Sequence, residues 1–254
     1  MAINVNTVYQ TVLMILNKEQ RGYMTPTEFN KVATQVQLEI FEKYFDDLNQ
    51  QLRVPQADTD YADRQESIDE KMAVFKTFGN AEYDSSNVNS GPYFTLPISD
   101  VYSNGATVNF YKIGNVLYND EKIVQRLDRH EFYYVNQSKL TKPTIVNPVY
   151  LYENQKLFIK PLTIIDKIKV DYIRKPTDPR WGITVGNLGQ YQYNDSVYDK
   201  NQNPTGSTDF ELTESEQIEV VLKILLYSGI IIRDPEVIQT AAALVQADEA
   251  NQKS

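Results

Sequence analysis

The sequence lacks cysteine and contains a single histidine, His130, among its 254 residues. The missing cysteines exclude disulfides, thiolate catalysis and zinc or iron–sulfur sites that depend on cysteine. One histidine excludes a histidine-rich metal site within one chain and leaves His130 as the sole base for a nucleophile–histidine–acid triad. We therefore expect no metal, no cofactor and no catalytic residues, and the composition favours a protein that works by contact.

Long apolar runs are also missing. The longest, residues 220–232, is interrupted by Lys223, whereas a membrane-spanning helix needs about 18 or more apolar residues. The first six residues carry neither a basic nor an apolar signal segment. We expect a soluble protein without a membrane partner that is made and assembled in a cytoplasm.

Motifs that mark enzymes are scarce as well. The sequence contains no glycine-rich phosphate loop and no dinucleotide fingerprint. Asp58 and Asp60 have the spacing of two metal carboxylates, but the glycine and glutamate of a calcium loop do not follow them. His130 stands among charged residues, which is typical of a surface or interface histidine. Glycosidase-type carboxylate pairs meet only in the fold, so an enzyme is the weakest of our hypotheses.

The sequence is rich in uncharged side chains that form hydrogen bonds, and its charged residues are unevenly distributed along the chain. It contains 20 Asn, 18 Gln and 18 Tyr, which suits polar, wet interfaces or reflects a bias of the source genome. Residues 209–254 carry nine acids and three bases, whereas residues 107–176 carry seven acids and twelve bases. The two regions could attract each other head to tail between copies, or they could be ordinary solvated faces.

Helical periodicity opens the chain. Apolar residues recur at three- and four-residue steps over residues 5–15 and 29–48, which is the period of one helix face. Gly22 breaks the pattern, and Thr25 with Glu28 has the spacing of a capping box. We expect two long helices that pack antiparallel across a short turn.

The middle of the chain changes to the period of strands. The turn signals 114–115 and 154–155 separate some of them, and a short helix is expected at 128–138. A third helix (64–78) and a turn-rich segment (79–92) precede this region. The predicted strands are residues 93–97, 106–113, 116–118, 149–152, 156–160 and 167–173.

Residues 177–209 are rich in proline and glycine and predict a long irregular loop. Such a loop is uncommon in a compact domain unless it binds something or stays disordered until a partner arrives. Its aromatic side chains favour binding. They are candidate interface residues: Trp181, Tyr191, Tyr193 and Tyr198.

Helical signals return after residue 210. Thr213 and Glu216 repeat the capping-box spacing, and the helix expected at 214–231 is apolar on nearly every face, so it must be covered on every face. A last helix is expected from Asp234 onward. Further candidate interface residues lie on these helices: Val221, Leu222, Leu225 and Leu244.

We predict an α+β fold. Segments 1–78 and 210–254 form a helical core by packing against each other, and an antiparallel β-rich domain (93–176) is inserted between them. Residues 177–209 form the long irregular loop, which we expect to be an interaction loop.

Three stretches, taken in their order and spacing, resemble a known family. They are Tyr23-Met24-Thr25-Pro26-Thr27-Glu28-Phe29 in the opening hairpin, Asp128-Arg129-His130-Glu131-Phe132 with Leu157-Phe158-Ile159-Lys160-Pro161 in the β-region, and Asp209-Phe210-Glu211-Leu212 with Arg233-Asp234-Pro235-Glu236 near the end. The chain resembles the head-to-tail connector proteins (adaptors or tail rings) of short-tailed bacteriophages, in particular the ring protein below the portal in crAss-like phages.

This resemblance implies a non-enzymatic virion subunit in the tail or neck. Such subunits form a ring, commonly of twelve copies, that binds the portal protein and the next tail ring and surrounds the DNA exit channel. The net charge of −9 fits a channel past which DNA slides without specific binding. The alternatives are a carbohydrate- or host-surface-binding tail module, in which tyrosines stack on sugar rings, and a tail-associated hydrolase.

Overall fold

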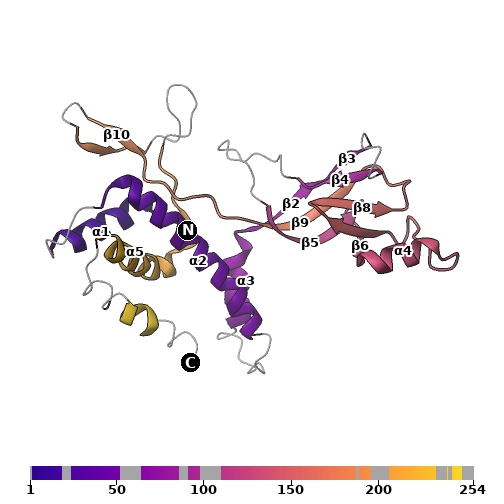
Figure 1. Cartoon of the computed structure of the whole chain (residues 1–254), viewed down its shortest axis with the longest axis horizontal. Helices are drawn as coiled ribbons and strands as arrows, with labels where there is room; N and C mark the ends of the chain where they lie inside the picture. Colours follow the sequence, from indigo (N-terminus) through magenta and orange to yellow (C-terminus); the bar gives the residue numbers. More distant parts are fainter. Residues whose placement is uncertain are drawn as a thin grey trace. The chain divides into compact units, whose positions relative to one another are not determined.

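A computed structural model divides the chain into two compact units (Figure 1). One, the helical unit, combines Met1–Val74 with Pro176–Ser254, and the other, the sheet unit, is Phe75–Lys175. The fold is α+β, and the β-rich part is formed by the middle of the chain. The structure describes residues 2–18, 24–51, 64–85, 91–97, 110–186, 189–195, 206–232, 239 and 242–247.

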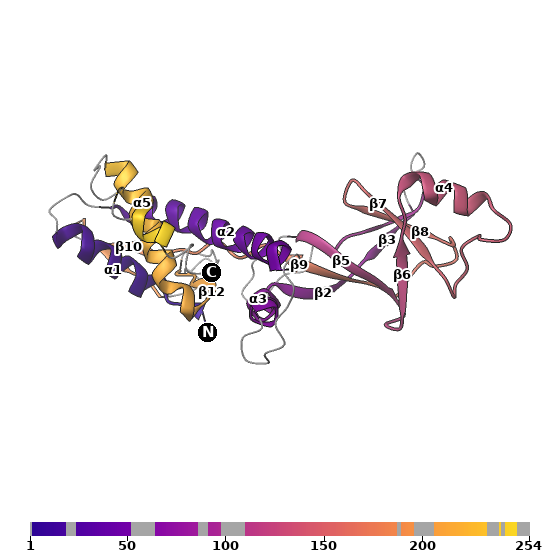
Figure 2. The same cartoon turned by 90° about the horizontal axis from the view of Figure 1, so that it is seen from below.

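Helices dominate the helical unit. They are α1 (Val5–Lys18), α2 (Pro26–Gln51), α3 (Arg64–Ala73), the short 3₁₀ helix η1 (Glu214–Glu216) and α5 (Gln217–Ile232). Helix α5 lies beside both α1 and α2 (Figures 1 and 2). A short antiparallel pair of strands, β1 (Ala2–Ile3) and β12 (Phe210–Thr213), joins the two chain segments of the unit.

The two predicted capping boxes have different outcomes. At α2 the prediction is confirmed, because Glu28 accepts hydrogen bonds from the backbone N–H (2.9 Å) and the hydroxyl (2.7 Å) of Thr25. At η1 it is wrong: Thr213 makes no side-chain cap bond, and Glu216 instead accepts from the hydroxyl of Tyr44. The predicted third helix is also too long, since α3 ends at Ala73 and a strand begins at Lys76.

Eight strands form one sheet in the sheet unit, in the order β2-β9-β5-β6-β7-β8-β4-β3. The edge strands β2 and β3 are consecutive in the chain and are separated by Ala81 alone, whose N–H donates to the carbonyl of Ile168 at 2.9 Å. The sheet therefore curls until its two edges meet. Its strands are β2 (Lys76–Asn80), β3 (Glu82–Asp84), β4 (Tyr93–Thr95), β5 (Phe110–Tyr118), β6 (Lys122–Arg126), β7 (Val149–Glu153), β8 (Lys156–Lys160) and β9 (Ile168–Arg174).

Side chains on the two faces of β7 show how the sheet is covered. Tyr150 joins a large apolar core inside the curled sheet, which also contains Val116 and Leu157. Val149 and Leu151 point the other way and pack with Phe132 of α4 (Arg129–Gln137). Because side chains alternate along a strand, α4 lies on the outer face of the sheet (Figure 2).

The sheet departs from the prediction in two places. Residues 114–115 do not form a turn, because β5 continues through them with a bulge opposite β9. Gly114 fits there, since a Cβ atom would lie 3.1 Å from the carbonyl oxygen of Asp171. The sheet is mixed rather than purely antiparallel: β6 and β7 are parallel, joined by the crossover that contains α4, as parallel neighbours require.

The predicted irregular loop also contains regular structure. Strands β10 (Ile183–Val185) and β11 (Tyr191–Tyr193) form a short antiparallel hairpin. In the sheet unit, Asn154 and Gln155 adopt positive φ angles of 50° and 58°, which confirms the hairpin turn expected there.

Candidate interaction surfaces

Helix α5 carries three of the predicted interface residues. Val221 and Leu225 are 9% and 7% exposed, Leu222 is partly buried, and Ile218 on the same helix is 74% exposed. The chain therefore covers much of this apolar helix itself. Among the described side chains of α5, Ile218 is the large apolar one most open to a neighbour.

Charged side chains fasten α5 to α2. The ammonium group of Lys223 lies 2.6 Å from a carboxylate oxygen of Glu39, and that of Lys43 lies 3.0 Å from Glu219. The hydroxyl of Tyr227 donates to the other oxygen of Glu39 at 3.1 Å. Breaking a buried pair leaves an uncompensated charge, so these pairs fix which faces of the two helices can meet.

Glu216 forms a second polar junction. Its carboxylate accepts from the hydroxyl of Tyr44 on α2 and lies 3.0 Å from the ammonium group of Lys71 on α3. Burial raises the pKa of Tyr44, and the negative charges of Glu216 and Glu219 raise it further. The junction thus keeps the Tyr44 hydroxyl protonated, as a donor to the carboxylate of Glu216.

Two amide side chains on α2 hold the returning segment of the chain. Asn30 donates to the carbonyl of Trp181 (3.2 Å) and accepts from its N–H (2.7 Å). Gln37 donates to the carbonyl of Thr177 (2.7 Å) and accepts from the N–H of Glu211 (3.0 Å). Asn30 and Gln37 are two helical turns apart and so share one face of α2. They satisfy backbone groups as a neighbouring strand would.

Trp181 anchors the base of the hairpin. Its indole N–H donates to the side-chain oxygen of Asn6 at 3.0 Å, and its ring lies 4.7 Å from that of Tyr9 and 5.6 Å from that of Tyr193. The backbone is close as well, because a Cβ atom on Gly182 would lie 2.5 Å from the carbonyl oxygen of Asn194. Trp181 is buried, so its direct surroundings belong to this chain.

Beyond this base, the hairpin presents apolar side chains to solvent. Val185 is exposed and Tyr191 is 47% exposed, whereas Tyr193 is partly buried. Burial raises the pKa of the Tyr193 hydroxyl. Of the other predicted interface residues, Tyr198 lies outside the described residues, and Leu244, in the helical stretch 242–247, is exposed.

The sheet unit carries an exposed surface around α4 that the sequence analysis did not single out. We call it the α4 patch and define it by Tyr133, Leu140, Lys142, Lys160 and Leu162. Leu140 is 94% exposed, and Tyr133 and Leu162 are also exposed. The sequence signal is a stretch without acids: between Glu131 and Glu153 the charged residues are Lys139 and Lys142 alone.

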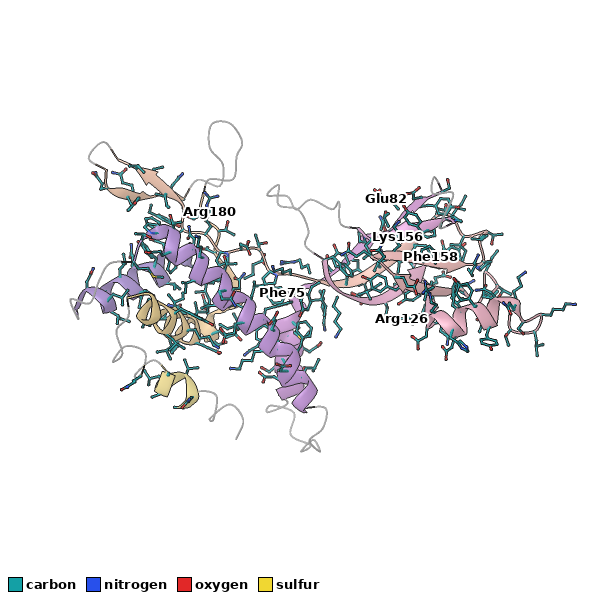
Figure 3. All side chains as sticks on the ribbon, in the orientation of Figure 1. Phe75, Glu82, Arg126, Lys156, Phe158 and Arg180 are labelled. Carbon is teal, nitrogen blue, oxygen red and sulfur yellow. The ribbon has the colours of Figure 1, made fainter. Side chains whose placement is uncertain are left out.

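A cavity of about 370 Å³ opens within the α4 patch. Tyr133, Phe158, Lys160 and Leu162 are among its lining residues, together with the ion pair of Arg129 and Glu153. Figure 3 labels Phe158 on β8. Burial lowers the pKa of Lys160, and the positive charge of Lys142 lowers it further. In the described part of the chain, no carboxylate is paired with either lysine.

A second cavity, of about 480 Å³, lies at the turn that follows β5. Asn80, Asn119 and Lys167 are among its lining residues. The ammonium group of Lys169 is occupied there, because it lies 2.9 Å from a carboxylate oxygen of Asp120. Each of the two cavities therefore contains one ion pair and one lysine outside that pair, Lys160 in the first cavity and Lys167 in the second.

Neither cavity is lined by His130. Its ring lies 4.5 Å from that of Tyr134 on the exposed side of α4, and its neighbour Arg129 pairs with Glu153 at 3.0 Å. Among the residues that the structure describes, no group of three or more histidine, aspartate or glutamate side chains could hold a metal ion. The described helices include none long and apolar enough to cross a bilayer.

Comparison of the sequence with protein-family models and with curated proteins identifies no match. The functional argument therefore depends on the units, their charges and their exposed surfaces.

Proposed function

We propose that the protein is a structural virion subunit. Copies of it form a head–tail connector ring that docks under the portal, joins capsid to tail and surrounds the DNA exit channel. The observation that carries this proposal is the construction of the chain. A helical unit formed from both ends of the sequence is interrupted by a sheet unit, which is the organisation that the sequence pattern predicts.

Charge supports a ring in which each copy uses two different surfaces. The helical unit contains 24 acids and 12 bases, whereas the sheet unit contains 10 acids and 13 bases. A closed ring has heterologous interfaces, so each copy needs two complementary patches. An acidic helical unit around the channel also disfavours adhesion of DNA as it passes.

The anchored hairpin supports contact with a neighbour. Asn30 and Trp181 hold its base, while Val185 and Tyr191 are exposed beyond it. An exposed tyrosine supplies a large, rigid contact area with a polar end. We assign the hairpin to contacts within the ring or with the next tail component.

Electron microscopy of the full chain, mixed with the portal protein encoded by the same genome, tests the proposal. We expect closed rings that stack on the portal in negative stain, and a matching ring mass in native mass spectrometry. A chain that stays monomeric and does not bind the portal would contradict the proposal.

Exposed tyrosines give the carbohydrate-binding alternative a specific location. Tyr133 and Tyr134 are both exposed on α4, and aromatic faces of this kind can stack on sugar rings. A glycan array probed with the full chain separates the two functions. Specific glycan binding that is lost in Tyr133→Ala with Tyr134→Ala, in a chain that forms no ring, would favour the tail module.

A further inference from the structure

We propose that the α4 patch binds the acidic helical unit of a second copy of this chain, at a stripe on α3. The proposal deepens the ring function and rests on it. It joins one surface of the sheet unit to one surface of the helical unit, and so provides the two different patches that a closed ring requires.

The chemistry of the α4 patch calls for a partner that is both acidic and apolar. Burial lowers the pKa of Lys160, and the positive charge of Lys142 lowers it further, so both ammonium groups act on one region of the patch. A carboxylate placed between two ammonium groups relieves the repulsion between them. Next to them, Leu140 and Leu162 are exposed, and covering such side chains is favourable.

The stripe on α3 offers the matching chemistry. Glu66 and Glu70 are exposed one helical turn apart, and the exposed Val74 follows one turn further along the sequence. In the described part of the chain, neither carboxylate is paired with a cation. Two carboxylates and a valine therefore face solvent, as two lysines and a leucine do in the α4 patch.

Charge over the whole unit points the same way. The helical unit has twice as many acids as bases, 24 against 12, so it attracts a basic surface over a longer range than the two contacts alone. A second copy is consequently the occupant that the charges favour, because each copy carries both halves of the interface.

A charge-swap experiment on the full chain tests the assignment. Lys142→Glu with Lys160→Glu should weaken self-association, alone or on the portal, by about tenfold or more, because like charges then face each other. Adding Glu66→Lys with Glu70→Lys to the same chain should restore it, since every interface then regains opposite charges. Sedimentation velocity and native mass spectrometry measure both effects.

Matched variants separate docking from folding. Lys122→Glu with Lys167→Glu makes the same charge change elsewhere in the sheet unit and should leave assembly unchanged. Because Lys160 is partly buried, Lys142→Glu with Leu140→Ser provides a second disrupting variant in which both positions are exposed. That variant should assemble less while its unfolding midpoint stays that of the wild type.

The outcomes distinguish this inference from the function on which it rests. A wild type that never assembles or binds the portal overturns both. Wild-type rings that both disrupting variants also form overturn the inference alone. Rescue by Asp248→Lys with Glu249→Lys instead of the α3 swap would place the C-terminal segment in the patch and overturn the assignment to α3. If the disrupting variants lose portal binding but still self-associate, the patch binds the portal, and the assignment to a second copy is wrong.

Discussion

The helical unit and the sheet unit both bury apolar side chains, but they differ in how many polar side chains are buried beside them. In the sheet unit, buried apolar side chains such as Leu157, Val170 and Tyr172 fill a curled sheet. In the helical unit, buried Gln37, Glu216, Glu219 and Lys223 pair across the interfaces between its elements. Apolar packing tolerates many arrangements of similar volume, whereas buried hydrogen bonds and ion pairs require particular partners. Both units thus have an apolar core, and the helical unit adds several buried polar pairs that select which of its elements can meet.

The largest expected effect comes from a charge without a partner on α5. Leu225→Asp would bury an unpaired carboxylate and should cost several kcal/mol of folding free energy, about 3 or more. Ile218→Asp on the same helix is the control, since Ile218 is exposed, and it should change stability by about 0.5 kcal/mol or less. Chemical denaturation followed by circular dichroism measures both. Equal effects of the two variants would contradict the placement of α5.

The next largest loss of stability is expected from a substitution in the apolar core of the sheet unit. Leu157 is fully buried, so Leu157→Ala should cost about 2–5 kcal/mol through lost burial and the cavity left behind. Leu162→Ala, at an exposed position in the same unit, should be close to neutral. Hydrogen exchange should locate the loss of protection in β7, β8 and β9. A cost below about 1 kcal/mol would contradict the burial of Leu157 in this core.

Gln37 tests whether the buried polar contacts stabilise the helical unit. Gln37→Ala leaves the partly buried carbonyl of Thr177 and the partly buried N–H of Glu211 without their partner and should cost about 1–3 kcal/mol. Gln10→Ala is the matched control, because Gln10 is exposed on α1, and it should have little effect. If the two variants melt at the same temperature, the amide clamp on α2 does not stabilise the unit.

We also expect the stability of the helical unit to depend on pH in the alkaline range. Tyr44 keeps its proton more tightly in the folded chain, so its stabilisation is complete below about pH 10, where tyrosine in the unfolded chain titrates, and is lost as pH rises above that. Tyr44→Phe should lower stability at pH 7 by about 1–3 kcal/mol and lose stability less steeply above pH 10. Tyr134→Phe, at an exposed position, should follow the wild type at every pH. Parallel curves for wild type and Tyr44→Phe would contradict the junction with Glu216.

The smallest loss of stability is expected at the N-caps of two helices, α2 and η1. Thr25→Ala removes a confirmed capping box at α2 and should cost about 1 kcal/mol. Thr213→Ala should cost less than half of that, because Thr213 makes no side-chain cap bond. Thermal unfolding of the two variants beside the wild type gives the order. A larger shift for Thr213→Ala would reverse the interpretation of both helix starts.

Local signals predicted the local parts of this fold. Thr25 and Glu28 mark the start of α2, and residues 154–155 mark a turn, because caps and turns involve neighbours in sequence. The parallel pairing of β6 with β7 depends on partners far apart in the chain, and no single stretch of sequence encodes it. The bulge at Gly114 looked like a turn because glycine serves both purposes.

The candidate surfaces divide in the same way. The tyrosines of the hairpin were identified by composition, and the structure places Tyr191 in the open. The roles of Asn30 and Gln37 were not predicted, because an amide on a helix cannot be distinguished from other polar surface residues until its backbone partners are known. The α4 patch was not predicted because Lys142 lies in a different segment from Lys160 and Leu162, the two of these residues that line the cavity.

The position of Ala81 between the two edge strands has a consequence for aggregation. A sheet with two long free edges offers templates on which strands of other copies can grow, and growth of this kind leads to insoluble aggregates. Here the edges are the short strands β2 and β3, which meet at Ala81. The eight-stranded sheet therefore offers only short lengths of unpaired strand to a strand of another copy.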